Sequence, residues 1–276
     1  MCRLLAFAST SASTFSDVLG IEEAAAFQHL ARVHDDGWGA MWTTQDGGLE
    51  RRRRTGGGMR DAALTNTLSG VRSRAAVAHL RLATGGLPVR SVNTHPFRAV
   101  TRLGPVGLAH NGSIMPIADL RALVSPAFLR DCAGTTDSEL YFALVRERIE
   151  EGAELAEAVA DTITTIRAHF PVAGLNAMVL GVDQLVVVRA STHAAVPTAH
   201  FAERGLDDAS LPPAHDEAYY DLRVRRTPDG GLAFASSGLD TTGWEDVPLD
   251  SLTVVDLMSM RMSTHALATA DAPARV

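Results

Sequence analysis

The apolar segments of this 276-residue chain change their period in a fixed order, and this order limits the folds open to it. Short apolar runs typical of strands come first, helical periods occupy the middle, and short runs return toward the C-terminus. Strands that alternate regularly with helices would indicate a parallel βαβ sheet, and the sequence lacks that alternation. The sequence therefore predicts an α+β domain built of stacked layers.

The expected strands are short apolar runs bounded by glycine or polar turn residues: Leu4–Ala8, Ala40–Thr43, Leu49–Arg54, Ala75–Ala83, Val106–His110, Asn176–Val182, Leu185–Arg189, Leu222–Arg226, Leu232–Ser236 and Leu252–Leu257. The expected helices have apolar residues at helical spacing: Ile21–Val33, Asp61–Gly70, Pro116–Val124, Asp137–Glu151 and Leu155–Phe170. The polar, proline-containing segment Ala199–Ala218 is expected to be a loop. We expect one domain over residues 1–263 and a frayed tail over residues 264–276.

Composition and charge exclude several classes of protein. With 46% apolar and 21% charged residues, the chain has an ordinary globular composition, and its length suffices for a core without disulfides or metals. The net charge of −7 argues against nucleic acid or anionic membrane as a partner, and the basic block Arg51–Arg54 is typical of a solvated strand. No apolar run approaches the ~20 residues that cross a bilayer, and Leu4–Ala8 is too short for a signal peptide, so we expect a cytoplasmic protein.

Cys2 carries the first chemical signal. Removal of Met1 would leave a thiol and a free α-amine on the same residue. Because an α-amine has a pKa of ~8, it can take the thiol proton near neutral pH and later return a proton to a leaving amine. Taken alone, Cys2 is explained more simply as a core cysteine on a buried strand. The other cysteine is Cys132, and two cysteines build neither a disulfide framework nor a Cys-rich metal site.

A second signal follows the expected strand that ends near residue 83. Arg81 and Thr84 precede two glycines, and a guanidinium at a strand exit can grip a carboxylate with two hydrogen bonds. A structural salt bridge would explain Arg81 but not the residues around it. His95, before Pro96, can act as a base or a metal ligand, yet without a partner cluster it is better explained as a hydrogen-bonded structural histidine. We expect no metal site.

Two later motifs offer an oxyanion hole and a carboxylate. Asn111-Gly112 follows an apolar strand, where it is first of all a turn signal, but an Asn amide and a Gly N–H can also stabilise one developing negative charge. Thr136 and Glu139 form a predicted capping box, with Asp137 in the first helical turn. The box alone explains Asp137, and the functional alternative is a carboxylate that binds a substrate ammonium.

Met-Cys-Arg, Arg-x-x-Thr-Gly with Asn-x-His-Pro, His-Asn-Gly and Thr-Asp-Ser-Glu occur in this order from position 2 to about 140. Together they resemble the glutaminase domain of class II glutamine amidotransferases, in the N-terminal-nucleophile hydrolase superfamily, and the resemblance extends weakly to Ser236–Leu239 and Trp244. It implies a four-layer αββα sandwich. It also implies these roles: Cys2 as nucleophile with its α-amine as base, Asn111 and Gly112 as oxyanion hole, Arg81 for the substrate carboxylate, Asp137 for its ammonium, and Thr84 and His95 lining the glutamate pocket.

Two departures bear on the substrate. Sugar-phosphate-type members have Trp-Ala-Thr-His where this chain has Leu82–Gly85, and the chain ends near the end of a glutaminase domain. It therefore resembles the stand-alone branch, which includes the γ-glutamyl hydrolase of ergothioneine biosynthesis. The function expected is hydrolysis of the γ-amide of glutamine or a γ-glutamyl compound without a cofactor.

Two alternatives remain. One is a glutaminase subunit that delivers ammonia to a separate synthase, or that forms a homo-oligomer. The other is a non-catalytic glutamine-binding scaffold, which is disfavoured because each chemical position of the motif set is filled.

Overall fold

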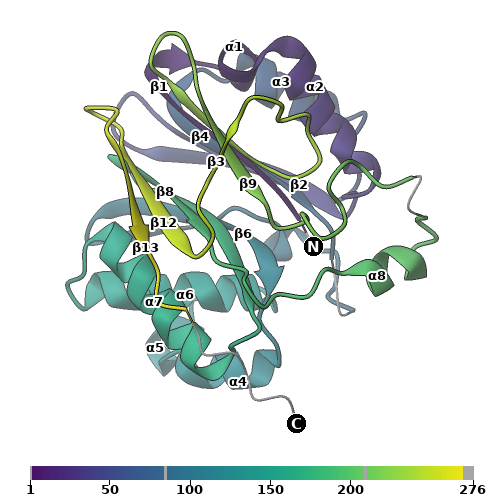
Figure 1. Ribbon diagram of the computed structural model, residues 1–276. Helices are drawn as coiled ribbons and strands as arrows, with labels where there is room; N and C mark the ends of the chain where they lie inside the picture. The colour runs from purple at the N-terminus through teal and green to yellow at the C-terminus, as the bar shows by residue number, and fades with distance from the viewer. Residues whose placement is uncertain (1, 84–85, 208–209, 270–276) are drawn as a thin grey trace.

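Two antiparallel sheets stack face to face, and helices cover both outer faces (Figure 1). The computed structural model describes residues 2–83, 86–207 and 210–269. The order of layers is helix, sheet, sheet, helix, so the predicted four-layer αββα sandwich of the α+β class is confirmed. None of the helices in the described ranges is both long enough and apolar enough to cross a membrane.

The first sheet has the strand order β11-β9-β10-β1-β4-β2-β3. Its strands are β1 (Arg3–Ser13), β2 (Gly37–Thr43), β3 (Leu49–Arg54), β4 (Ser73–Arg81), β9 (Leu222–Arg226), β10 (Leu232–Ser236) and β11 (Glu245–Asp246). Its outer face is covered by α1 (Phe15–Leu19), α2 (Ile21–His29) and α3 (Ala62–Gly70). The predicted helix Ile21–Val33 thus ends earlier, in the 3-10 turn Leu30–Arg32.

The second sheet has the strand order β13-β12-β8-β7-β6-β5. Its strands are β5 (Phe97–Thr101), β6 (Gly104–Ser113), β7 (Gly174–Leu180), β8 (Gln184–Arg189), β12 (Ser251–Asp256) and β13 (Met262–Ala266). Helices α6 (Asp137–Glu150) and α7 (Leu155–His169) pack on its outer face, with α4 (Ile117–Leu123) and α5 (Pro126–Leu129) beside α6. The 3-10 turn Ser91–Asn93 and α8 (Thr198–Glu203) lie in connecting segments.

The two-residue period of the strands divides the core into layers. On β1, Leu4 and Ala6 belong to the apolar cluster between the sheets, whereas Leu5 and Phe7 belong to the cluster under α1, α2 and α3. Successive side chains of a strand point to opposite faces, so one strand supplies both clusters. Side chains at alternate positions of β1, β4 and β6 therefore share the space between the sheets.

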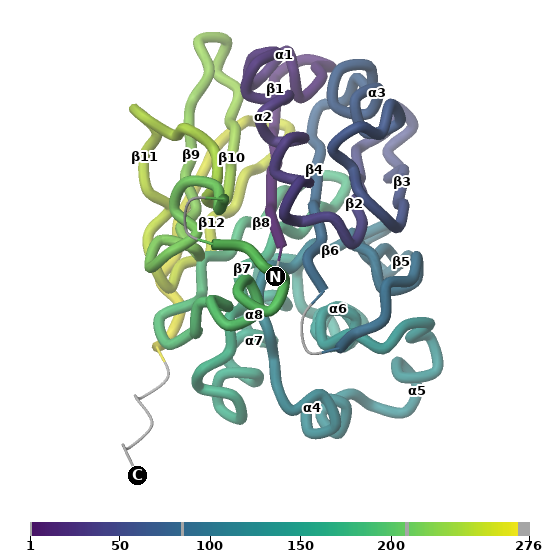
Figure 2. The backbone as a smooth tube through the Cα atoms, turned by 90° about the vertical axis from the view of Figure 1, so that its right-hand side faces the viewer, coloured from purple at the N-terminus to yellow at the C-terminus, as the bar shows by residue number. Residues whose placement is uncertain are grey.

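This alternation places polar side chains at one end of that space. Leu4 pairs with His79 of β4 in antiparallel register, so Cys2 lies near the strand end at Arg81. His79 and Arg81 share the face of Val77, which belongs to the cluster between the sheets. The start of β1 also approaches β6 of the second sheet (Figure 2). The site is therefore built where the two sheets meet.

Several elements differ from the sequence analysis. Helices α1 and α5 and strand β11 were not expected, and the turn expected at Asn111-Gly112 is wrong because both residues lie inside β6. β13 pairs Thr264 with Thr253 of β12, so ordered structure continues past the expected boundary at 263. Its side chains are mostly exposed, and an edge strand held by main-chain pairing shows no apolar alternation to reveal it. The edge strand β5 was also missed. The expected loop Ala199–Ala218 contains most of the short helix α8.

Candidate active site

Cys2 lies just before β1 with only 7% of its surface exposed. Its nitrogen donates a hydrogen bond of 2.9 Å to Asn111 Oδ1 of β6. Its Sγ lies 3.9 Å from the carbonyl oxygen of Leu82, to which the thiol donates. The first sheet thus presents a thiol and the second sheet an amide at the same point.

The fully buried Arg3 holds this residue in place. Its Nε donates to the carbonyl oxygen of Cys2 at 2.6 Å, and its Nη1 donates to the carbonyl oxygen of Ser237 at 2.9 Å. The guanidinium lies 3.9 Å from the ring centre of Tyr219. The sequence analysis gave Arg3 no role, although a charged residue at the start of a buried strand was a signal that it has a specific partner.

Asn111 is fully buried and has one free donor group. Its Oδ1 accepts from Cys2, whereas its Nδ2 has no partner among the described residues. Leaving a buried amide donor unpaired costs about 1–3 kcal/mol, so this donor is available to a bound oxygen atom. At the next position a Cβ would lie 1.8 Å from the carbonyl oxygen of Gly174, so the close approach of β6 and β7 requires glycine at Gly112.

A small cavity joins the predicted residues. The residues that line it come from both sheets and from the start of α6: Cys2, Arg81, Leu82, Ala83, Leu87, His95, His110, Gly112, Thr136, Asp137 and Ser138. Asn111 contacts this group through Cys2. Thr84, which the sequence analysis also placed in the glutamate pocket, lies outside the described residues.

Arg81 and Asp137 bring opposite charges to this cavity. Arg81 is 2% exposed; its Nη2 donates to the carbonyl oxygen of Pro88 at 3.4 Å, and its Nη1 has no partner in the described part of the chain. Asp137 accepts from the amides of Ile114 at 2.8 Å and Ser138 at 2.9 Å. The arrangement offers a free guanidinium donor and an anchored carboxylate, a pair that fits a zwitterionic amino acid.

The start of α6 differs from the predicted capping box. Thr136 Oγ1 accepts from the amide of Glu139 at 3.2 Å, which confirms Thr136 as N-cap. The Glu139 carboxylate accepts instead from the amides of Ala133 at 3.0 Å and Gly134 at 2.7 Å. The reciprocal half of the box is therefore wrong, because the preceding turn offers nearer donors.

His95 has the partner cluster that the sequence analysis did not find. Its ring centre lies 4.1 Å from that of His79, and neither of its ring nitrogens has a hydrogen-bond partner among the residues described. The prediction of a hydrogen-bonded structural histidine is therefore wrong. Burial lowers the pKa of both histidines well below 6.5, and the proximity of the two rings lowers the pKa of His95 further. Both rings are neutral at neutral pH.

Comparison with known proteins shows the family of this chain. The family model described as class II glutamine amidotransferases matches residues 1–226. The chain belongs to the class II glutamine amidotransferase family. The amidophosphoribosyltransferase of Synechocystis sp. is 33% identical over 112 residues, which are 41% of this chain and 21% of that protein. The glutamine–fructose-6-phosphate aminotransferase (isomerizing) of Brucella abortus biovar 1 is 36% identical over 135 residues, 48% of this chain and 21% of that protein.

Solved structures give the same fold. A glutamine aminotransferase class-II domain protein from Silicibacter pomeroyi has a TM-score of 0.63 at 18% identity, covering 97% of this chain and 100% of that one. The glutamine phosphoribosylpyrophosphate amidotransferase from B. subtilis, complexed with ADP and GMP, has a TM-score of 0.60 at 15% identity, covering 97% and 49%. The chain spans about a fifth of the length of the two curated relatives above.

In this amidotransferase domain, the carboxylate of Asp36 supports the site from the loop before β2. Asp36 Oδ2 accepts from the amide of Ala83 at 2.7 Å and from Arg204 at 2.6 Å, which holds the segment that follows Arg81 in place.

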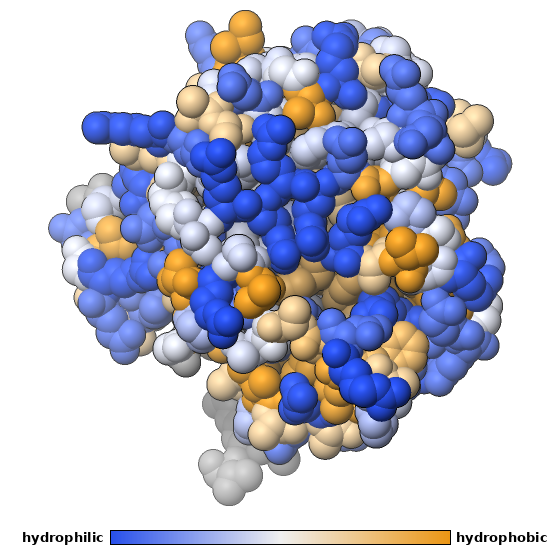
Figure 3. All heavy atoms as spheres, turned by 180° about the vertical axis from the view of Figure 1, so that it is seen from behind, coloured by the Kyte–Doolittle hydropathy of each residue, from blue (hydrophilic) through white to orange (hydrophobic). Residues whose placement is uncertain are grey.

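Figure 3 shows hydrophilic side chains clustered over the back face of the molecule, where the edge strands β3 and β5 lie.

Two arginines of the basic block also support the site. The block is β3 of the amidotransferase domain, and its side chains are mostly exposed, as expected of a solvated strand. Arg51 donates to the carbonyl oxygen of Pro96 at 3.1 Å, and Arg53 donates to that of Thr94 at 2.8 Å. These arginines hold the main chain on both sides of His95.

A second histidine pair lies behind Arg3 in the amidotransferase domain. The Nε2 atoms of His34 and His215 are 2.9 Å apart, and the His215 ring packs edge-on against Tyr219 at 5.3 Å. Burial, and to a lesser extent the charge of Arg3, lower the pKa of His215 to about 3. His215 therefore stays neutral in the folded protein over the whole range from pH 7 to 5.

We expect this histidine to make the stability of the domain depend on pH. In the unfolded chain His215 takes up a proton near pH 6.5, whereas in the folded chain it does so only near pH 3, so the free energy of unfolding falls as pH drops below 6.5. Between about pH 7.5 and 5.5 this side chain accounts for about 1.4 kcal/mol of that loss. His215→Gln should reduce the loss by this amount in denaturant titrations at both pH values. His169→Gln, at an exposed histidine of α7, should not, and an unchanged loss in His215→Gln would contradict the assignment.

Proposed function

We propose that this class II glutamine amidotransferase domain hydrolyses the γ-amide of glutamine or of a γ-glutamyl compound, with Cys2 as nucleophile. The observation that carries the proposal is the 2.9 Å hydrogen bond from the Cys2 nitrogen to Asn111 Oδ1. This bond turns the buried, unpaired Nδ2 of Asn111 away from the nitrogen and leaves it free for a substrate oxygen. One contact therefore orients both the base and the oxyanion donor.

Attack begins with a proton transfer within one residue. Removal of Met1 converts the Cys2 nitrogen into an α-amine, whose pKa of ~8 suits a general base near neutral pH. The amine takes the thiol proton, and the thiolate attacks the carbonyl carbon of the γ-amide. The oxygen of the tetrahedral intermediate accepts from Asn111 Nδ2 and from the N–H of Gly112.

Collapse of the intermediate breaks the C–N bond. The leaving nitrogen receives the proton held by the Cys2 α-ammonium and departs as ammonia or a larger amine, which leaves a γ-glutamyl thioester on Sγ. The α-amine then takes a proton from water, and the hydroxide attacks the thioester. Glutamate is released and the thiol is restored.

The charges of the cavity suit the glutamate half of the substrate. The free Nη1 of Arg81 binds the α-carboxylate, and Asp137, held by the amides of Ile114 and Ser138, binds the α-ammonium. His95 lines the same cavity. Arg81 and Asp137 do not select the leaving group, because they recognise only atoms that every γ-glutamyl compound has.

One assay tests this function and its alternatives. Purified protein is incubated with glutamine, glutathione and other γ-glutamyl amides, and glutamate release is measured. Turnover of glutamine with release of free ammonia supports the glutaminase reaction. The curated relatives are named as transferases, which makes delivery of ammonia to a synthase the second candidate to test. Absence of glutamate from every substrate would leave the non-catalytic scaffold.

The mature, active chain should begin at Cys2. The proposed base exists only after Met1 is removed, so intact-mass measurement of active protein should show the loss of Met1. Cys2→Ala should abolish turnover, whereas Cys132→Ala, at a half-buried thiol outside the cavity, should leave it nearly unchanged. Full activity with Met1 retained would exclude the α-amine as base.

Asn111 should contribute to kcat more than to substrate binding. Asn111→Ala should lower kcat by ~10²–10³, the usual effect of removing one oxyanion donor, with little change in KM. Asn111→Asp separates its two functions, because it keeps an acceptor for the Cys2 nitrogen but lacks the Nδ2 donor. It should be at least as slow as Asn111→Ala in steady-state kinetics. A normal kcat with a raised KM would make Asn111 a binding contact only.

Asp137 should select substrates that carry an α-ammonium group. Loss of one partner of a desolvated charge pair costs ~2–5 kcal/mol, so native protein should prefer glutamine to its des-amino analogue by well over tenfold in kcat/KM. Asp137→Asn should lose that preference. Because Asp137 also holds the amide of Ile114, the variant should be less stable as well. If it is less stable but keeps the preference, Asp137 is purely structural.

A further inference from the structure

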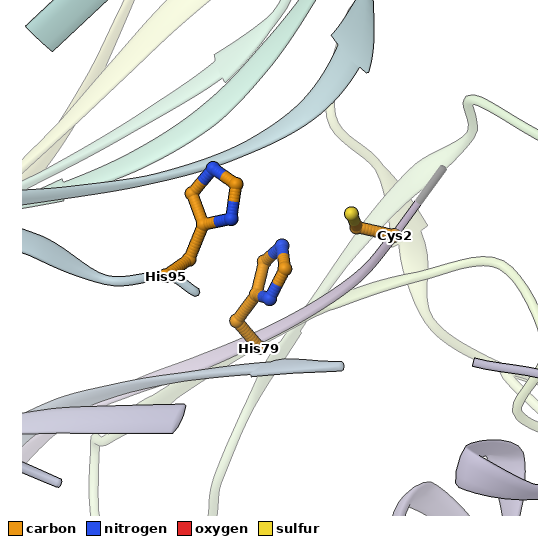
Figure 4. A group of neighbouring side chains, drawn as sticks. All are labelled: Cys2, His79 and His95. Atoms are coloured by element: carbon orange, nitrogen blue, oxygen red, sulfur yellow. The ribbon is translucent and has the colours of Figure 1, made fainter. Parts of the chain in front are cut away.

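Three possible metal ligands meet at the nucleophile. Cys2, His79 and His95 are all buried, and each offers one ligand atom within 4.8 Å of the other two. They come from the start of β1, from β4 and from the segment before β5. Figure 4 shows the thiol and the two imidazole rings around a common space. Neither the proposed reaction nor the substrate contacts require His79.

The hydrogen bonds of His79 leave one nitrogen free. Its Nε2 lies 3.2 Å from the carbonyl oxygen of His110, and a carbonyl can only accept, so Nε2 carries the proton. Its Nδ1 then has a lone pair, and no residue in the described ranges contacts it by a hydrogen bond. An imidazole that donates to a backbone carbonyl through one nitrogen is typical of a metal-binding histidine.

Ring packing alone, without hydrogen bonds to any described residue, holds the His95 side chain. Its ring lies between His79, at 4.1 Å, and Phe97, at 4.8 Å from centre to centre. A Cβ on Gly39 would lie 2.1 Å from the His95 carbonyl oxygen, so β2 also packs closely against this residue. Because both ring nitrogens lack a partner within the described part of the chain, rotation of the His95 side chain breaks no hydrogen bond.

The sulfur and nitrogen ligand atoms indicate which metal ion the three side chains would bind. Thiolate and imidazole suit Zn²⁺, whereas Mg²⁺ and Ca²⁺ require oxygen ligands. Zn–S bonds of about 2.3 Å and Zn–N bonds of about 2.0–2.1 Å place tetrahedral ligand atoms about 3.3–3.6 Å apart. The most distant of the three atoms must therefore approach one another by on the order of 1 Å. Because the lone pair of an imidazole nitrogen lies in the ring plane, the His95 ring must also turn out of its tilted stack on His79 when the metal binds.

We propose that Cys2, His79 and His95 form a Zn²⁺ site that reversibly blocks the nucleophile. Binding exchanges the thiol proton for a Zn–S bond, and the proton passes to solvent. His79 and His95 supply two neutral nitrogen ligands, and water occupies the fourth position. The sulfur electron pair that would attack the amide is then held by the metal. Metal binding is independent of the proposed function, whereas the inhibition rests on it.

Direct binding of Zn²⁺ to the full-length protein tests the site. Competition with a chromogenic chelator should show one Zn²⁺ per chain, and Cys2→Ala should lose it. His79→Asn and His95→Asn should each weaken binding by at least about tenfold, since loss of even an outer partner of a ligand costs 10–100-fold. Cys132→Ala and His169→Asn are the matched controls and should bind as native protein does. Native affinity in both folded cluster variants would overturn the proposal.

Alkylation of the native protein gives a test that needs no variant to fold. Zn²⁺ should slow the reaction of Cys2 with iodoacetamide at least tenfold, as measured by peptide mapping, without slowing that of Cys132, and a chelator should reverse the effect. Equal rates for Cys2 with and without Zn²⁺ would overturn the site. Protection of Cys2 in a protein that releases no glutamate would contradict the proposed function alone, whereas a glutaminase that Zn²⁺ does not inhibit would contradict the regulatory part of this inference.

Discussion

The buried guanidinium of Arg3 is the interaction on which the rest of the site depends. A buried charge is tolerated only when it is well hydrogen-bonded, and Arg3 donates to the carbonyl oxygens of Cys2 and Ser237 while it lies over the Tyr219 ring. These contacts tie the first residues of the chain to segments more than 200 positions away. Because Arg3 holds the main chain at Cys2, the Cys2 nitrogen stays within hydrogen-bond distance of Asn111 in the other sheet.

The same two-residue strand period builds the core and the site. Along β1 and β4, apolar side chains fill the space between the sheets until His79 and Arg81 replace them at one end. Several donors there have no partner among the described residues, including those of Arg81 and Asn111. Such unpaired groups reduce stability, but they are already oriented for a ligand that pairs with them. The site is thus prepared by the fold at a cost in the free energy of unfolding.

The layers follow from local patterns in the sequence, because short apolar runs indicated β1, β4 and β6. The spaced motifs pointed to Cys2, Arg81, Asn111 and Asp137, and the structure brings these residues together at one place. Features that depend on tertiary contacts were missed. His95 contacts His79 of β4 only because the segment before β5 packs closely against β2 at Gly39, a contact between residues far apart in the sequence. The exposed edge strand β13 was not predicted, because main-chain hydrogen bonds hold it in the sheet and its side chains show no apolar alternation.

The central claim is that Cys2 attacks the γ-amide, and trapping the covalent intermediate tests it most directly. Protein mixed with glutamine is quenched in acid within the first turnovers, digested and mapped by mass spectrometry. The account predicts a γ-glutamyl group on the peptide that begins with Cys2, and none on the peptide that contains Cys132. Glutamate release without any modified Cys2 peptide, or a γ-glutamyl group on another residue, would contradict it.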